Sequence, residues 1–295
     1  MEVLSQDQID FYAANGWLTL ESRIPADVIG DIRAEIARFT DEARGMTESN
    51  DRLDLETSHT PDDPRVRRIK LPHTISDVVA RLMRSDAILA PVRDLIGPDV
   101  RLHTTKLNMK SAGYGAAICW HQDFAFYPHT NDDVLAVGVM VDDMGPENGP
   151  LMVFPGSHKG TIHDHHADGV FAGAMDLAAN GYDLADAAML TGPAGTISIH
   201  HGRIVHGSAT NTSTRDRRVL FIEAMAADAF PIMGGMTKFD TIAEYDSRIL
   251  CGAPTVAPRL ADIPVRIPQP QPSKNRSIYE IQAGTPDRSF ERTAT

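Results

Sequence analysis

The chain has 295 residues, 28 basic and 40 acidic side chains, a formal net charge of −12 and a hydrophobic fraction of 42%. This composition is typical of a globular protein with a full core, and the acidic balance argues against nucleic-acid or anionic-membrane surfaces, which need clustered lysines and arginines. Two cysteines, Cys119 and Cys251, are too few for a disulfide framework, and the start MEVLSQDQID lacks the basic and apolar regions of a secretory signal. We therefore expect a cytoplasmic protein with no nucleic-acid or membrane partner.

The first 98 residues predict a mostly helical layer. Ser5 and Gln8 fit a capping box, and Gly16 ends this first helix before the short strand candidate 17–20. Pro25 opens a second helix with a regular apolar stripe. The polar segment 45–64 predicts an exposed loop, and two short helices follow at 76–83 and 86–96.

Beyond Pro98 the pattern changes to short strands, which predicts a sandwich or barrel rather than alternating β-α units. Glycine, proline, asparagine or aspartate separates most of these segments, and the tail 253–273 is rich in proline, which favours an extended wrap. We read one domain over 1–295, with a helical layer at 1–98, a β core at 99–232 and a C-terminal wrap at 233–295. The expected strands are 100–109, 116–121, 134–141, 151–154, 196–200, 204–206 and 219–224.

The segment CWHQDFAFYP, residues 119–128, predicts part of a metal site. His121 and Asp123 are two residues apart at a strand end, so alternation sends both side chains to one face. One imidazole and one carboxylate supply two ligands of a facial triad for Fe(II), and a second histidine from elsewhere must complete it. The pattern alone also fits a histidine beside a solvated aspartate.

A second segment, SIHHGRIVHGSATNTSTRDRRVLF at 198–222, supplies the missing parts. His206 closes a short β run, and Arg217 follows eleven residues later on the next expected strand. A hairpin of that length places Arg217 on the strand beside His206, where its guanidinium can pair with the distal carboxylate of a metal-chelating keto acid.

Taken together, WHQD, ENGPLMVFPGSHKG at 147–160 and HGSATNTSTRDRR resemble the phytanoyl-CoA dioxygenase (PhyH-like) family of Fe(II)/2-oxoglutarate oxygenases, over about residues 5–231. The resemblance implies a mainly β fold with flanking helices, a double-stranded β-helix (jelly roll, cupin-like) behind an N-terminal helical layer. It also implies iron ligands at His121, Asp123 and His206, and 2-oxoglutarate contacts at Arg217, Ser208 and Asn108.

The function implied by this resemblance is hydroxylation, or another oxidation, of an unactivated C–H bond in a small-molecule metabolite. Fe(II) is the cofactor, 2-oxoglutarate and O2 are co-substrates, and succinate and CO2 are released. Halogenating relatives carry a small residue in place of the carboxylate, so Asp123 favours hydroxylation. Two alternatives stay open: a non-catalytic sensory member of the same fold, and a zinc hydrolase with the same ligands. A monomer and a homodimer both remain compatible with the sequence.

Substrate contacts are the least determined part of the sequence. Phe124 and Tyr127 follow the expected metal ligand and are candidates for one pocket wall, while Lys106 and Arg203 are cations on strands near the cavity. An inward cation favours a carboxylate, phosphonate or CoA phosphate on the substrate, but outward, solvated positions fit these residues equally well. The cluster His163–His166 predicts a solvated or lid-lining loop, and of His200 and His201 only one can face the cavity, because they alternate on a strand.

Overall fold

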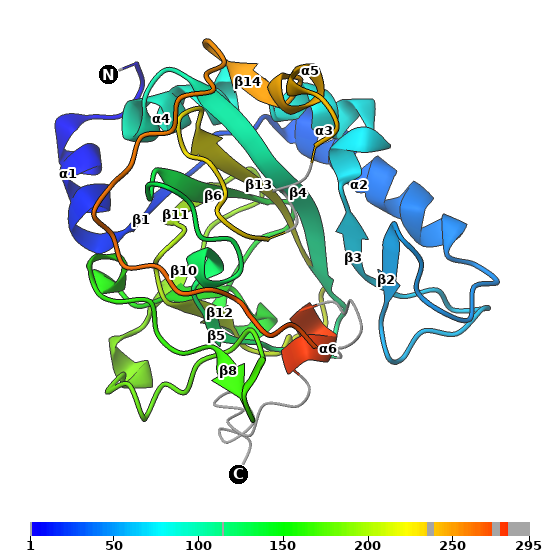
Figure 1. The fold of residues 1–295 in the computed structure, drawn as a ribbon. Coiled ribbons are helices and arrows are strands. Elements are labelled where there is room, and N and C mark those ends of the chain that lie inside the picture. The colour runs from blue at the N-terminus through cyan, green and yellow to red at the C-terminus, as the bar shows by residue number, and fades with distance from the viewer. Residues whose placement is uncertain (1, 114, 235–238, 273–277, 283–295) are drawn as a thin grey trace.

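The structure, a computed structural model, describes residues 2–113, 115–234, 239–272 and 278–282 (Figure 1). Residues 235–238, 273–277 and 283–295 of the expected C-terminal wrap lie outside the described residues. Within the described ranges, no helix combines the length and apolarity that crossing a bilayer requires.

Two antiparallel sheets make up the β core (Figure 1). The larger has eight strands and the smaller has four in the order β10-β7-β12-β5, and a β8-β9 hairpin stands apart. The large sheet runs β1 (Trp17–Leu20), β11 (Ile197–His201), β6 (Val134–Met140), β13 (Arg217–Ala226), β4 (Val100–Lys110), β3 (Val66–Lys70) and β2 (Leu53–Leu55), with β14 (Ile249–Cys251) also paired to β4. The other strands are β5 (Ile118–His121), β7 (Leu151–Val153), β8 (His166–Ala167), β9 (Val170–Phe171), β10 (Ala188–Leu190) and β12 (His206–Ser208).

The N-terminal helices form as the sequence predicts. In α1 (Gln6–Asn15) the Ser5 hydroxyl and the Gln8 side chain form the capping box, and Gly16 takes the left-handed conformation with φ 80°. The further helices are α2 (Ala26–Glu42), α3 (Asp77–Leu82), α4 (Asp86–Ile96), α5 (Ile242–Asp246) and α6 (Ile278–Gln282). Single 3-10 turns lie at Pro72–Thr74, Asp123–Ala125, Pro146–Asn148, Ser157–Lys159 and Leu184–Asp186.

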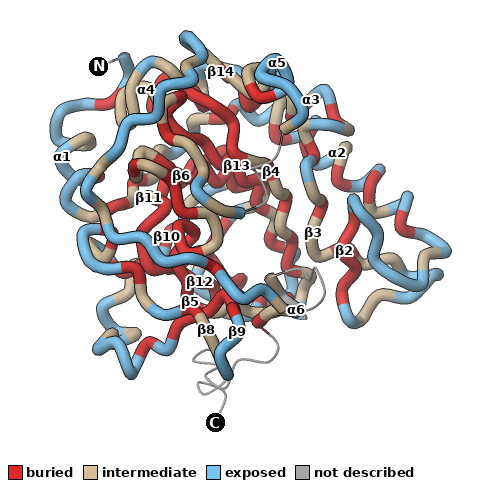
Figure 2. The backbone as a smooth tube through the Cα atoms, viewed as in Figure 1, coloured by how far each residue is buried: buried red, intermediate tan, exposed pale blue. Residues whose placement is uncertain are grey.

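The main hydrophobic core lies between these helices and the outer face of the large sheet. The apolar stripe of α2 (Ile29, Ile32, Ile36 and Phe39) is buried there, together with β4 and β13 residues such as Leu107 and Leu220. Figure 2 shows the buried segments concentrated along these strands, whereas the tail between β14 and α6 is largely exposed. The other face of the large sheet is therefore free to line a cavity.

The first and last parts of the chain add strands to this sheet. The segment 45–64, which we expected to be an exposed loop throughout, contains β2, whose three residues are all buried. The hydropathy pattern does not reveal this strand for two reasons. Charged residues surround Leu53 and Leu55, and only three residues pair with β3. After β14, residues 253–272 form no helix or strand and cross the surface toward α6 (Figure 1).

Candidate metal and co-substrate site

Three side chains converge in a cavity of about 360 Å³ between the two sheets. His121 ends β5 and His206 begins β12, directly opposite it in register. Asp123 lies two residues beyond the end of the strand, in a 3-10 turn, and its side chain still points into the same cavity. Its Oδ1 is 3.7 Å from His121 Nε2 and 3.8 Å from His206 Nε2. Ligand atoms of the three residues all lie within 4.8 Å of one another, which is the spacing a shared metal ion requires.

Backbone carbonyls orient both imidazoles. His121 Nδ1 donates to Cys119 O at 2.8 Å, and His206 Nδ1 donates to Ile204 O at 3.0 Å. A carbonyl oxygen only accepts, so each Nδ1 carries the proton and each Nε2 presents a lone pair to the cavity.

The electrostatics of the three residues also suit a divalent cation. Burial opposes ionisation of Asp123, but Lys106 and the histidines outweigh it and hold the pKa of this carboxyl well below its usual range. Burial and the neighbouring His121 lower the pKa of His206 well below its ordinary value. Two imidazoles and one carboxylate with an open face form a donor set that Fe(II) accepts.

His200 is the histidine of its pair that faces the cavity. Its Nε2 lies 3.6 Å from Asp123 Oδ2, and neither ring nitrogen has a hydrogen bond within the described part of the chain. His201 points to the other face, where its Nε2 is 3.9 Å from Asp132. The expectation that strand alternation separates the two histidines is met.

Gln122 anchors the chain between His121 and Asp123. Its fully buried amide donates to Arg203 O at 2.7 Å and to Thr161 O at 3.1 Å, and accepts from the amide of His163 at 2.9 Å. His165 Nε2 accepts the Gln122 backbone N–H at 2.9 Å. The cluster His163–His166, which we expected to be solvated or to line a lid, therefore anchors the metal strand through two of its members.

At the other end of the cavity, polar side chains surround Arg217. Arg217 is 3% exposed and donates from Nε to Gly149 O at 3.0 Å. Lys110, its cross-strand partner, donates to Ser208 Oγ at 2.8 Å. Ser208 and Asn108 also line the cavity, and Asn108 Oδ1 is buried with no hydrogen-bond partner in the described residues. The Arg217 guanidinium, with the Ser208 hydroxyl and the Asn108 amide beside it, fits a carboxylate.

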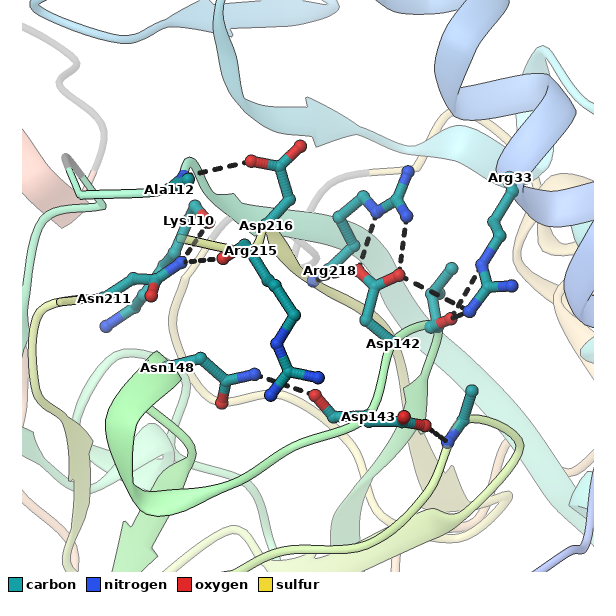
Figure 3. Close-up of polar contacts among 12 residues, drawn as sticks. Arg33, Lys110, Ala112, Asp142, Asp143, Asn148, Asn211, Arg215, Asp216 and Arg218 are labelled. Atoms are coloured by element: carbon teal, nitrogen blue, oxygen red, sulfur yellow. Dashed lines mark hydrogen bonds and ion pairs between the residues drawn. The ribbon is translucent and has the colours of Figure 1, made fainter. Parts of the chain in front are cut away.

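The direction of Arg217 follows from its neighbour. Arg218 turns away from the cavity and forms a bidentate pair with Asp142, at 2.7 Å from Nε and 2.5 Å from Nη2, and Arg33 lies close by (Figure 3). Alternation along β13 then sends Arg217 inward. We expected Arg217 on the strand beside His206, but β12 and β13 belong to opposite sheets, because the connection between them crosses from one sheet to the other.

The four candidate substrate residues separate into two pairs. Tyr127 and Lys106 line the cavity, and Lys106 Nζ is 2.5 Å from Glu223 Oε1. Phe124 does not line it: the side chain is fully buried in an apolar cluster behind the metal strand, because the chain bends at the 3-10 turn. Arg203 does not line it either, since its guanidinium is bound by Asp132 at 2.6 Å and by Gly160 O at 2.6 Å.

Sequence reasoning missed Glu223 and Arg68, both of which line the cavity. Glu223 is 1% exposed, and an acidic residue inside the apolar run VLFIEAMA was a usable signal, because a buried carboxylate needs a partner. Arg68 lies in a polar segment where nothing in the sequence separates it from its solvated neighbours.

Comparison with known proteins identifies the family. The family model for phytanoyl-CoA dioxygenase (PhyH) matches residues 12–219. The chain is 35% identical to a probable alpha-ketoglutarate-dependent hypophosphite dioxygenase of Stutzerimonas stutzeri, over 92% of this chain and 94% of that protein. It is 32% identical to L-proline trans-4-hydroxylase of Streptomyces griseoviridis, over 72% of this chain and 82% of that protein.

The fold agrees with solved relatives. A crystal structure of EctD from S. alaskensis with 2-oxoglutarate and 5-hydroxyectoine superposes with a TM-score of 0.62 at 26% identity, over 76% of this chain and 77% of that chain. The EctD apoform gives 0.63, also at 26% identity, over 76% and 78%. The predicted jelly-roll class and the predicted dependence on Fe(II), 2-oxoglutarate and O2 are thereby confirmed. The chain belongs to the phytanoyl-CoA dioxygenase (PhyH) family and is a Fe(II)- and 2-oxoglutarate-dependent dioxygenase.

Proposed function

We propose that His121, Asp123 and His206 hold the Fe(II), and that the enzyme hydroxylates an unactivated C–H bond of a small-molecule metabolite, with release of succinate and CO2. The observation that carries this proposal is the convergence of the three ligand side chains with Arg217 in one buried cavity. Iron and 2-oxoglutarate, when bound, supply the oxidising chemistry. The chain supplies ligand geometry, two imidazoles, an ionised carboxylate and a shielded space.

Arg217 and Ser208 would hold the distal carboxylate of 2-oxoglutarate, with Asn108 as a further contact. Arg217 donates from Nε and Nη2 to Gly149 O, and these hydrogen bonds fix the orientation of its guanidinium before the co-substrate binds. Lys110 donates to Ser208 Oγ, which leaves the Ser208 O–H to donate elsewhere, so Arg217 and Ser208 present preformed donors to one carboxylate at the far end of the cavity.

The size of the cavity limits the substrate. About 360 Å³ must accommodate both 2-oxoglutarate and substrate, near the lower end of ligand pockets, which range over about 300–1,000 Å³. Tyr127, Lys106 and Glu223 on the wall are polar. This supports a small polar metabolite over an acyl-CoA or a large natural-product scaffold.

A succinate-release assay tests the proposal. Purified protein with Fe(II), 2-oxoglutarate and O2 is given L-proline, ectoine and an acyl-CoA, and product is followed by mass spectrometry. We expect a visible absorption band when Fe(II) and 2-oxoglutarate are added anaerobically, and a product heavier by one oxygen with one small substrate. The absence of both the absorption band and succinate would refute the proposal. A band without succinate would favour a sensory role.

A second candidate is oxidation of a small phosphorus oxyanion. It is favoured by the similarity to the hypophosphite dioxygenase, which extends over nearly the whole of both chains, whereas the match to L-proline trans-4-hydroxylase covers 72% of this chain. Adding hypophosphite to the same assay distinguishes it, because phosphite rather than a hydroxylated carbon compound is then formed with the succinate.

A further inference from the structure

Among the described residues, Arg68 is the cation of the active-site cavity that makes neither a hydrogen bond nor an ion pair. Arg68, Lys106 and Arg217 are the arginine and lysine residues that line it besides Lys110, whose pKa burial and Arg217 lower well below its usual value. Asp123 and Glu223 are its carboxylates. Glu223 balances Lys106 at 2.5 Å. The proposed function, on which this inference rests, assigns Asp123 to the metal and Arg217 to 2-oxoglutarate, so Arg68 is left over.

Arg68 is on β3, the strand that the N-terminal part of the chain adds next to β4. Its cross-strand partner is Asn108, and paired residues of neighbouring strands project from the same face of a sheet. The Arg68 side chain therefore enters the cavity from the side wall, beside Asn108.

The guanidinium of Arg68 has no counter-ion. Among the described residues it makes no hydrogen bond or ion pair, and its Nε is buried without a partner. Burial and Arg68 oppose protonation of Lys106, but Glu223 and Asp123 outweigh them and raise the pKa of this amine, so Lys106 is a second cation near Arg68. Glu223 pairs with Lys106, so the half-buried guanidinium of Arg68 keeps a positive charge that a bound anion would neutralise.

The groups around Arg68 favour an anion with several oxygens. Thr104, Lys106 and Asn108 lie along β4 facing the cavity, where the hydroxyl, the ammonium group and the amide N–H can donate hydrogen bonds to an anion. A planar guanidinium binds a carboxylate or a phosphorus oxyanion through two parallel hydrogen bonds. When an anionic substrate enters the site already loaded with iron and 2-oxoglutarate, it would form one such pair of hydrogen bonds with Arg68 and neutralise the excess positive charge.

We propose that Arg68 is the substrate-recognition residue of this dioxygenase and that the substrate carries an oxyanion, either a carboxylate or a phosphorus oxyanion, which Arg68 binds. Arg68 then sets substrate specificity and leaves 2-oxoglutarate to Arg217.

Binding measurements on the full chain, loaded anaerobically with Fe(II) and 2-oxoglutarate, test this directly. Calorimetric titrations use hypophosphite, L-proline and L-prolinamide, the last of which keeps the ring and lacks the carboxylate. We expect at least one of the two anionic probes to bind at least about tenfold more tightly than the amide, and Arg68→Gln to weaken that binding about tenfold or more. Which of the two binds tells a phosphorus oxyanion from a carboxylate.

Two variants serve as controls. Arg67→Gln removes the same charge from the adjacent position, which faces the other side of β3, and should leave anion binding within about twofold. Arg68→Lys keeps the charge without the planar guanidinium and should give an intermediate loss of anion affinity. Such a result would show that the geometry of the guanidinium, and not the charge alone, contributes to binding. The affinity for 2-oxoglutarate should stay unchanged in all three variants.

The inference is wrong if neither anion binds more tightly than the amide, if Arg68→Gln and Arg67→Gln behave alike, or if Arg68→Gln weakens 2-oxoglutarate binding. Succinate release is measured in parallel on the unmodified enzyme. Failure to bind or turn over 2-oxoglutarate contradicts the proposed function itself, whereas normal turnover with no dependence on Arg68 contradicts this inference alone.

Discussion

Gln122 is the residue on which the placement of the candidate metal ligands depends most directly. It lies between His121 and Asp123 in sequence and faces the opposite way, into the protein. Its side chain binds Arg203 O, Thr161 O and the amide of His163. We predict that Gln122→Met, which keeps the side-chain volume and removes all three hydrogen bonds, lowers both stability and affinity for Fe(II).

The magnitude follows from the partners left behind. The carbonyl of buried Arg203 and the amide of His163 lose their partner, at about 1–3 kcal/mol for each stranded group. Thr161 is exposed, so water can replace the bond to its carbonyl. We therefore expect Gln122→Met to lower the free energy of unfolding by about 2–6 kcal/mol, and Gln122→Ala to lower it by about 1–2 kcal/mol more, because it also leaves a cavity.

Unfolding of the metal-free protein in guanidinium chloride measures the stability change, and anaerobic titration with Fe(II) measures the metal affinity. Loss of a residue that orients a metal ligand lowers metal affinity by about 10–100-fold. Gln6→Met is the matched control, since Gln6 is exposed on α1 and should change stability by less than about 0.5 kcal/mol. A Gln122→Met variant within about 1 kcal/mol of the unmodified protein, with undiminished iron affinity, would refute this account of the metal strand.

Three further predictions concern the site and the core. His121→Ala and His206→Ala should each abolish succinate release and the anaerobic absorption band, and turnover in either folded variant would remove that residue from the ligand set. Arg217→Ala should raise the KM for 2-oxoglutarate by about tenfold or more and leave that for substrate nearly unchanged, whereas equal effects would argue against its assignment. Burial and the neighbouring His103 lower the pKa of His129 to about 3. In the unfolded chain His129 binds a proton near pH 6.5, whereas in the folded chain it stays neutral down to about pH 3. Stability should therefore fall as the pH drops from about 6.5 toward 3. His129→Gln should make that fall shallower in urea unfolding measured at a series of pH values, and an unchanged slope would contradict this.

Local signals in the sequence were sufficient for several elements. The capping box of α1 and the apolar stripe of α2 appear as expected, because both depend on residues within one or two helical turns. His121 and Asp123 face the same cavity as expected, although Asp123 lies in a turn beyond the strand, and their role as metal ligands stays a prediction. In each case the determining contacts are between residues close in sequence.

Long-range packing decided what sequence reasoning missed. Arg203 looks like a cation near the cavity, and only the fold shows that Asp132 and Gly160 bind it. Phe124 follows the metal strand, yet the turn after Asp123 carries it into the apolar cluster. Arg68 reaches the cavity because β3 pairs with β4. Each outcome depends on a pairing or a turn that no local pattern encodes.

Alternation along the strands also explains why the candidate site tolerates so much charge. On β13, Arg217 faces the cavity while Arg218 is neutralised by Asp142 on the other side. On β4, Lys106 is paired with Glu223 from the neighbouring strand. Arg217 and Lys110, in contrast, donate to the Gly149 carbonyl and to Ser208. Among the described residues, Arg68 is the lysine or arginine of this cavity that makes neither a hydrogen bond nor an ion pair, which points to a partner that arrives with the substrate.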